Sequence, residues 1–145
     1  MKLSARYSFN APQAKVFSAL VDPAIIQKCI DGCEKMERTG SDSYDAHLKI
    51  GIAGLKGSYV GKVLIEDKKE PESFALRVEG KGAPGWVKGT AKIQISPNGD
   101  GSELQCDSEG QVGGVIAAVG SRLVEAVGKR MQDDFFRKLG EQVAG

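Results

Sequence analysis

The sequence predicts an α+β domain in which a seven-stranded antiparallel sheet curls around one long C-terminal helix. Two observations lead to this prediction. Between residues 33 and 112, apolar and polar residues alternate in short runs separated by turn residues, with no helical segment between them, as in consecutive antiparallel strands. From about residue 115 to 139, the apolar residues recur instead with the 3.6-residue period of an amphipathic helix.

The first 32 residues add one strand and two short helices. Residues 2–9 alternate between apolar and polar side chains, which is typical of a half-buried strand. Asn10 and Asp22 are each an N-cap candidate, and a proline follows each within two residues. We therefore expect two short helices with a capped break between them, the second ending by Gly32.

Six further strands follow the helices. The run Gly82-Ala83-Pro84-Gly85 is glycine-rich, but no helix and no Gly-Lys-Ser/Thr ending follow it, so a strand break is favoured over a phosphate-binding loop. Residues 97–101 have the composition of a hairpin turn. The apolar rows that predict the strands lie at 34–38, 44–52, 59–65, 74–78, 87–95 and 104–112.

The C-terminal helix is expected over about residues 115–139. Gly120 falls in the middle of its apolar sector, where a glycine costs about 1 kcal/mol relative to alanine, so we expect close packing or open space there. Asp134 projects into the same sector, either solvated past the sheet or paired with a partner such as Arg77, and Phe136 points to the polar side. The apolar sector, about 100° wide, contains Ile116, Leu123, Val124, Val127, Met131 and Phe135.

A sheet that curls around such a helix is the helix-grip arrangement, and no linker or internal repeat interrupts it. We therefore expect a single helix-grip domain over residues 1–145. The 19 glycines among 145 residues exceed the usual fraction of about 7%. They gather at strand ends and breaks, where they would let a sheet bend.

Composition excludes several classes of protein. A net charge of +1 argues against a nucleic-acid binder, which normally has a strongly basic face. No run of apolar residues is long enough for a membrane-spanning helix. The N-terminal residues lack the apolar core of a signal peptide, so we expect a cytoplasmic protein with reduced thiols.

The sequence shows no catalytic or metal-binding centre. His47, the single histidine, alternates with the apolar row of its strand and is expected at the surface. Cys29 and Cys33 lack both the redox spacing and a neighbouring histidine and are expected to be structural. One histidine does not supply a usual zinc site. We expect no metal and no cofactor.

The inner face of the sheet is predicted to be aliphatic, with small residues and few polar groups. Such a concave surface would bind an apolar molecule; the alternative is a fully packed core. Trp86 is expected either at the mouth of the cavity or facing outward. The predicted ligand-binding residues are Leu48, Ile50, Tyr59, Leu76, Val78, Trp86, Ile93, Gly120, Leu123, Val124, Val127 and Met131.

Several short motifs, in this order, carry a family resemblance. They are Asn10-Ala11-Pro12, Asp22-Pro23, Cys29-Ile30-Asp31-Gly32-Cys33-Glu34, Glu79-Gly80-Lys81-Gly82, Lys88-Gly89-Thr90-Ala91, Gln111-Val112-Gly113-Gly114, Gly120-Ser121-Arg122-Leu123 and Asp134-Phe135-Phe136. Over about residues 1–140 the chain resembles the CoxG family of carbon monoxide dehydrogenase proteins, within the START-like, polyketide-cyclase-like (SRPBCC) superfamily. Asp31 stands where the family usually has a proline.

The resemblance implies a non-catalytic accessory protein of a molybdenum hydroxylase of the carbon monoxide dehydrogenase type, acting in its maturation or membrane attachment. It also implies a hydrophobic ligand, lipid- or quinone-like. Some family members carry a C-terminal apolar anchor, whereas this chain ends at Gly145, so peripheral contact with the inner membrane face is the expectation. The alternatives are a small polyketide-cyclase or hydratase-like enzyme that uses the same cavity, and an interaction module with a solid core. Gly120→Leu is expected to block the cavity.

Overall fold

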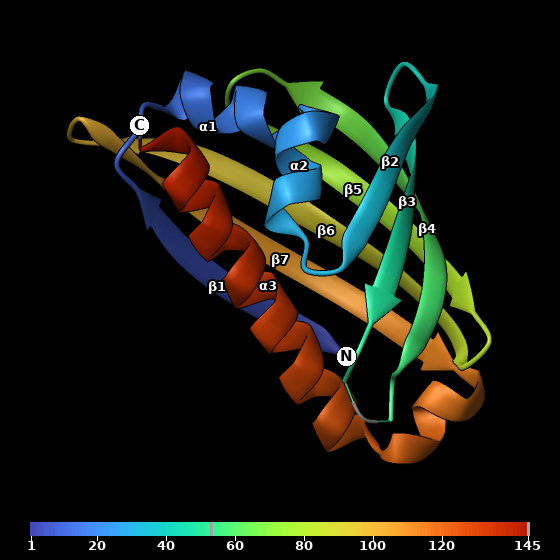
Figure 1. The fold of residues 1–145 in the computed structure, drawn as a ribbon. Helices are drawn as coiled ribbons and strands as arrows, with labels where there is room; N and C mark the ends of the chain where they lie inside the picture. The colour runs from blue at the N-terminus through green and yellow to red at the C-terminus, as the bar shows by residue number, and fades with distance from the viewer. Residues whose placement is uncertain (53, 145) are drawn as a thin grey trace.

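The computed structural model describes residues 1–52 and 54–144 and has the predicted architecture (Figure 1). One seven-stranded sheet forms a curved wall, and three helices lie against its concave face. The elements are β1 (Lys2–Phe9), α1 (Gln13–Leu20), α2 (Pro23–Cys29), β2 (Cys33–Gly40), β3 (Ser43–Ile50), β4 (Gly57–Lys69), β5 (Ser73–Gly82), β6 (Gly85–Asn98), β7 (Gly101–Gly113), the 3₁₀ helix η1 (Gly114–Val119) and α3 (Ser121–Val143).

The sheet is a meander closed by its first strand. Its order is β1-β7-β6-β5-β4-β3-β2, and every neighbouring pair is antiparallel. The tight turns expected after Gly82 and Asn98 are both present. Because side chains alternate between the two faces of a strand, the predicted apolar rows lie on the concave inner face, and the polar rows lie on the outer face.

The two short helices begin differently. Asp22 caps α2 as predicted, since its Oδ1 accepts a hydrogen bond from the backbone N–H of Ala24 at 3.0 Å. The prediction that Asn10 caps α1 was wrong. The cap position is Pro12, which has no side-chain acceptor, so α1 depends on the burial of Val16, Phe17 and Leu20.

The start of the C-terminal helix differs from the prediction. Residues 114–119 form the 3₁₀ helix η1, and α3 begins only at Ser121. Gly120 therefore lies between two helices, with φ 99° and ψ 146°, a backbone conformation that favours glycine. A 3₁₀ turn has a period of 3.0 residues, close enough to 3.6 that Ile116 still fell in the predicted apolar sector.

Two α3 residues also lie differently from their predicted positions. Phe136 is buried and stacks on Tyr7, with ring centroids 4.4 Å apart, because the helix crosses β1 on the side that its sequence period predicts to be polar. Asp134 does not enter the apolar interior. Its carboxylate lies 3.9 Å from the Arg130 guanidinium and 3.7 Å from that of Arg137, on the same helix.

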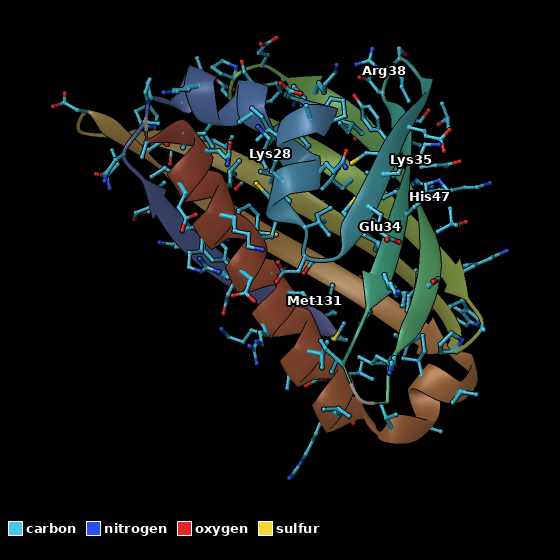
Figure 2. The ribbon with its side chains drawn as sticks, in the orientation of Figure 1. Lys28, Glu34, Lys35, Arg38, His47 and Met131 are labelled. Carbon is cyan, nitrogen blue, oxygen red and sulfur yellow. The ribbon has the colours of Figure 1, made fainter. Side chains whose placement is uncertain are left out.

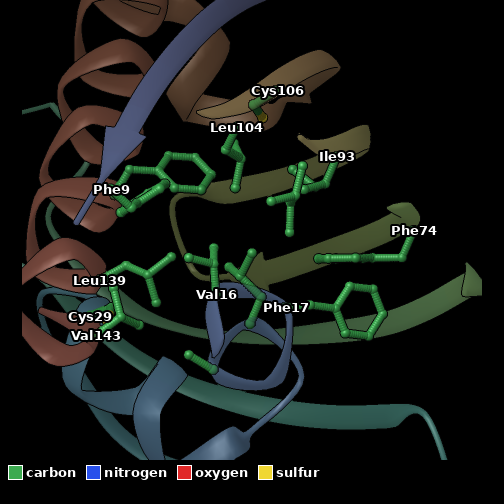
Figure 3. Close-up of a cluster of buried hydrophobic side chains, with 14 of the residues drawn as sticks. Phe9, Val16, Phe17, Cys29, Phe74, Ile93, Leu104, Cys106, Leu139 and Val143 are labelled. Atoms are coloured by element: carbon green, nitrogen blue, oxygen red, sulfur yellow. The ribbon is translucent and has the colours of Figure 1, made fainter. Parts of the chain in front are cut away.

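The apolar interior has two parts. The larger cluster lies between α1, the C-terminal half of α3 and the sheet, and includes Phe17, Phe74, Ile93, Leu104 and Leu139 (Figure 3). The smaller cluster lies at the other end of the sheet and consists of Leu55, Tyr59, Ile116 and Val124, with half-buried residues packed around them.

Removing the α2 cap tests the local origin of this helix. Asp22→Ala leaves an unpaired N–H at the start of α2 and should lower the free energy of unfolding by about 1 kcal/mol. Asp22→Asn keeps an acceptor at the same position and should stay close to the parent protein in urea unfolding. Equal destabilisation by both variants would contradict a capping role.

Candidate functional site

An apolar cavity of about 200 Å³ lies between α2, the Phe135–Phe136 segment of α3 and the inner face of β2–β6. The Tyr44 hydroxyl is the one oxygen or nitrogen that the lining side chains bring to it. The cavity is lined by Leu20, Val21, Pro23, Ile26, Ile30, Met36, Tyr44, Ala46, Leu48, Gly61, Val63, Ile65, Phe74, Leu76, Val78, Ile93, Phe135 and Phe136.

Small residues on the sheet keep this space open. Ala46 and Gly61 are paired on β3 and β4, and Gly61 is paired in turn with Gly80 on β5. A Cβ atom added at Gly61 would meet only the Ala46 carbonyl oxygen, at 3.9 Å, and one added at Gly80 would meet nothing within 4 Å. Larger side chains would fit at both positions without backbone strain, so the hollow results from side-chain size and not from chain geometry.

The structure separates the residues predicted to bind a ligand into three groups. The first group lines the cavity and comprises Leu48, Leu76, Val78 and Ile93. All four point inward from β3, β5 and β6, as the alternation predicted. Ile93 is nearly completely buried, whereas the other three are half-buried.

The second group lies in the smaller apolar cluster, outside the cavity lining. It comprises Ile50, Tyr59, Val124 and Val127. The Tyr59 hydroxyl already donates a hydrogen bond to the Leu55 carbonyl oxygen at 2.6 Å. Tyr59 therefore supports the chain between β3 and β4.

The third group lies outside both the cavity and the smaller cluster. Trp86 takes the outward alternative, with 37% of its surface exposed and the Lys88 amine 5.8 Å from its ring centroid. Leu123 is 40% exposed, and Met131 is half-buried on α3 (Figure 2). Gly120 lies at the η1–α3 junction, so Gly120→Leu would strain the backbone there and would not fill the cavity.

The sequence analysis missed the contribution of α2. Pro23, Ile26 and Ile30 cover the cavity, together with Met36 on β2. The signal was present: α2 has seven residues, of which only Cys29 is fully buried, although Ile25 and Ile26 are also apolar. A short helix with more apolar residues than one packing stripe requires is suited to cover a hollow.

A polar network fixes α3 beside the cavity. The Tyr7 hydroxyl donates to Asp133 Oδ1 at 2.6 Å and accepts from Gln132 Nε2 at 3.2 Å, while Lys129 Nζ lies 2.6 Å from Asp133 Oδ2. Burial, and then the bond to Asp133, raise the pKa of Tyr7 to about 12. The Lys129 ammonium and then the Tyr7 hydroxyl lower the pKa of Asp133. The predicted Glu125–Lys129 pair is replaced by this one.

The cavity lining, as described, contains no carboxylate, imidazole or thiol. His47 lies at the β2–β3 edge of the sheet, away from α3 (Figure 2), and its Nε2 is 3.0 Å from Glu37 Oε1. Cys29 and Cys106 are buried, and burial raises the pKa of both thiols, that of Cys106 to about 11. Within residues 1–52 and 54–144, no group of three or more metal-ligating side chains comes together.

Two wider hollows lie on the outer face of the sheet and are open to solvent. Their volumes are about 440 and 600 Å³. Charged side chains line both of them, including Lys2, Arg77 and Glu109. They lack the enclosure and the apolar lining of the inner cavity, which is therefore the candidate site.

Comparison with known proteins agrees with the fold and the site. The family model for the carbon monoxide dehydrogenase protein CoxG matches residues 6–144. The chain belongs to the CoxG family. A conserved protein from Geobacillus kaustophilus is 36% identical to this CoxG-family protein, with a TM-score of 0.96 over 99% of this chain and 95% of that one.

More distant structures share the fold of the CoxG-family protein. A START superfamily protein from Mycobacterium smegmatis has a TM-score of 0.76 at 15% identity, over 98% of this chain and 96% of that one. Ara h 8.0201 has a TM-score of 0.69 at 15% identity, over 99% and 97%. The helix-grip fold of the START-like superfamily is thereby established. No curated protein matches the chain by sequence.

The CoxG-family protein has no helix, within its described residues, that combines the length and apolar character needed to cross a membrane.

The Tyr7 network predicts a late phenol titration. The folded state favours the neutral phenol, so its contribution to stability is complete below pH 10 and is lost as the pH rises toward about 12. Monitored by tyrosinate absorbance, Tyr7→Phe should remove the step near pH 12, whereas Tyr44→Phe should retain it. Persistence of that step in Tyr7→Phe would show that another tyrosine carries it.

Proposed function

We propose that this CoxG-family protein binds a lipid- or quinone-like molecule in the cavity beneath α2. The observation that supports the proposal is the enclosed apolar space of about 200 Å³, to which one hydroxyl is the only polar side-chain contribution. An apolar cavity of this kind stays free of water and accepts apolar molecules. Its few polar groups would leave the ligand's identity to size and shape.

Unfilled apolar volume destabilises a folded protein, by roughly 24 cal/mol for each Å³ of cavity. Here a single larger side chain at Gly61 would remove part of that volume without backbone strain. The presence of glycine at this position is therefore more consistent with a space that a ligand occupies than with a solid core.

The size of the cavity limits what it encloses. Sites for drug-sized ligands usually have about 300–1,000 Å³, so this cavity of about 200 Å³ suits a ring system or a short acyl segment. The rest of a longer molecule would extend past Gly80, where a side-chain atom would meet nothing within 4 Å. An isoprenoid quinone and a single-chain lipid both have this form.

Family membership supports the second part of the proposal. We infer that the protein is an accessory of a molybdenum hydroxylase related to carbon monoxide dehydrogenase, serving its maturation or its membrane attachment, in the cytoplasm and in peripheral contact with the inner membrane face. A role as carrier needs no acid–base group in the cavity, whereas the alternative cyclase-like role does, and the lining offers only the Tyr44 hydroxyl.

Filling the cavity tests ligand binding. Gly61→Val adds two methyl groups beyond Cβ and should weaken binding of 2-methylnaphthalene and of menadione, the same ring with two carbonyls, by at least about tenfold, as expected when a site is overpacked by about 1–3 kcal/mol. NMR shifts of the cavity methyl groups would measure both affinities. Gly51→Val is the matched control, because a Cβ there also meets nothing within 4 Å but lies outside the cavity.

The outcomes separate the competing functions. Unchanged affinity in Gly61→Val, or in Gly61→Ala if the valine variant does not fold, would overturn the assignment of the cavity. Stoichiometric apolar material in an organic extract of the purified protein, identified by mass spectrometry, would support binding, and its absence together with no menadione binding would favour a solid interaction module. Chemical conversion of a bound compound would favour an enzyme.

The accessory role has a separate test. Affinity-tagged protein, expressed with the molybdenum hydroxylase encoded near its own gene, should co-purify with that enzyme and should raise the fraction of it found on membranes. Deletion of the gene with no change in the enzyme's activity or membrane fraction would contradict this role and leave ligand binding untouched.

A further inference from the structure

The charged residues of this nearly neutral chain are unevenly distributed. Residues 46–65, 80–99 and 110–124 contain no Asp or Glu. These three segments are far apart in the sequence, but they converge at one end of the molecule, drawn at the bottom of Figure 1. This end comprises residues 51–52 and 54–56, the β5–β6 turn, η1 and the first turn of α3, and is called the η1 end below.

Direct contacts hold the η1 end together. The backbone N–H of Ile116 in η1 donates to the Pro84 carbonyl oxygen of the β5–β6 turn at 2.9 Å. A Cβ on Gly54 would lie 2.9 Å from a Val119 methyl and 3.7 Å from a Leu123 methyl, so the β3–β4 connection packs on η1 and α3. The smaller apolar cluster lies directly beneath.

Basic side chains surround this end without ionic partners. Lys49, Lys56, Lys81, Lys88 and Arg122 are all exposed, and none of them forms an ion pair with any described residue. The bordering acids, Glu79 and Glu125, are likewise outside the ion pairs of the described chain. Most other basic residues are paired, as Lys68 is with Asp42 at 2.7 Å.

Apolar side chains are exposed at the same end. The described part of the chain leaves seven large apolar residues exposed, and four of them belong to this end: Val115 at 66%, Leu123 at 40%, Ile52 at 38% and Trp86 at 37%. Single exposed apolar residues are common on protein surfaces. Their concentration within a ring of unpaired cations is not, and it matches the two layers of an anionic membrane surface, whose headgroups attract lysine and arginine and whose acyl boundary accepts aliphatic and tryptophan side chains.

We propose that the η1 end is the surface by which this protein docks on anionic lipid bilayers. The basic side chains bind lipid phosphates, while Val115, Ile52, Leu123 and Trp86 enter the headgroup region. This proposal specifies the membrane contact proposed above, and it does not depend on whether the cavity holds a ligand.

Sedimentation with lipid vesicles tests the proposal. Vesicles of phosphatidylcholine containing phosphatidylglycerol should bind the protein, whereas vesicles of phosphatidylcholine alone should bind it weakly, and salt should release it because exposed charges are screened. The double variant Lys56→Glu/Arg122→Glu should weaken binding at least about tenfold. Lys15→Glu/Lys69→Glu, at exposed, unpaired positions away from the η1 end, changes the net charge equally and should bind like the parent.

Trp86 supplies a direct optical reading, since it is the single tryptophan of the chain. Its emission should shift to shorter wavelength on anionic vesicles, and brominated lipids should quench it. Val115→Asp, at a position too exposed to affect folding, should reduce both vesicle binding and the shift.

Equal loss of binding in the two double variants would overturn the proposal, because it would reveal an effect of total charge alone. Absence of binding to anionic vesicles would also overturn it and would leave an acidic protein as the partner of this surface. Menadione binding in solution is measured without vesicles, so failure here is distinguishable from failure of the cavity assignment.

Discussion

The structure depends on a mismatch in width between one helix and one sheet. Seven strands spaced about 4.8 Å apart form a wall roughly 29 Å across, whereas an α-helix with its side chains is about 10–12 Å wide. Accordingly, α3 packs mainly on β1, α1 packs on β6 and β7, and α2 packs on β2. The inner face of β3–β5 is left without a helix in close contact. The apolar cavity lies there, so it follows from the architecture and does not need a special loop.

Residue size then decides whether the uncovered region is filled. At one end Phe17, Phe74 and Ile93 fill it, and at the other Leu55, Tyr59 and Ile116 do so. Between the two clusters the inward positions of neighbouring strands are glycines, with Gly61 paired to Gly80 and Gly89 paired to Gly110. The unusual glycine content of the chain therefore has a mechanical meaning here, since these glycines leave room between two packed clusters.

Periodicity predicted the strands, the long helix and four cavity residues because each depends on which face of an element is apolar, a property local to the sequence. The Asp22 cap was predictable for the same reason. Gly120 was misplaced because a 3₁₀ turn and an α-helix differ by only about 0.6 residue per turn. The role of Ile26 and Ile30, and the division of Tyr59 and Val124 from the cavity, depend on where separate elements meet in space. No local pattern contains that information.

The two ends of the molecule also differ in how firmly they are held, which bears on how a ligand would reach the cavity. On one side, α2 is fixed by its Asp22 cap, by buried Cys29 and by the ion pair between Asp31 and Lys138 of α3. On the other, the η1 end rests on the smaller cluster, and segments with few buried contacts open at lower free energy than the core. A molecule taken from a bilayer would therefore meet the more easily opened end first, and the glycines at Gly80 and Gly61 lead from that end toward the cavity. Membrane docking and ligand binding would then use opposite ends of one continuous apolar face.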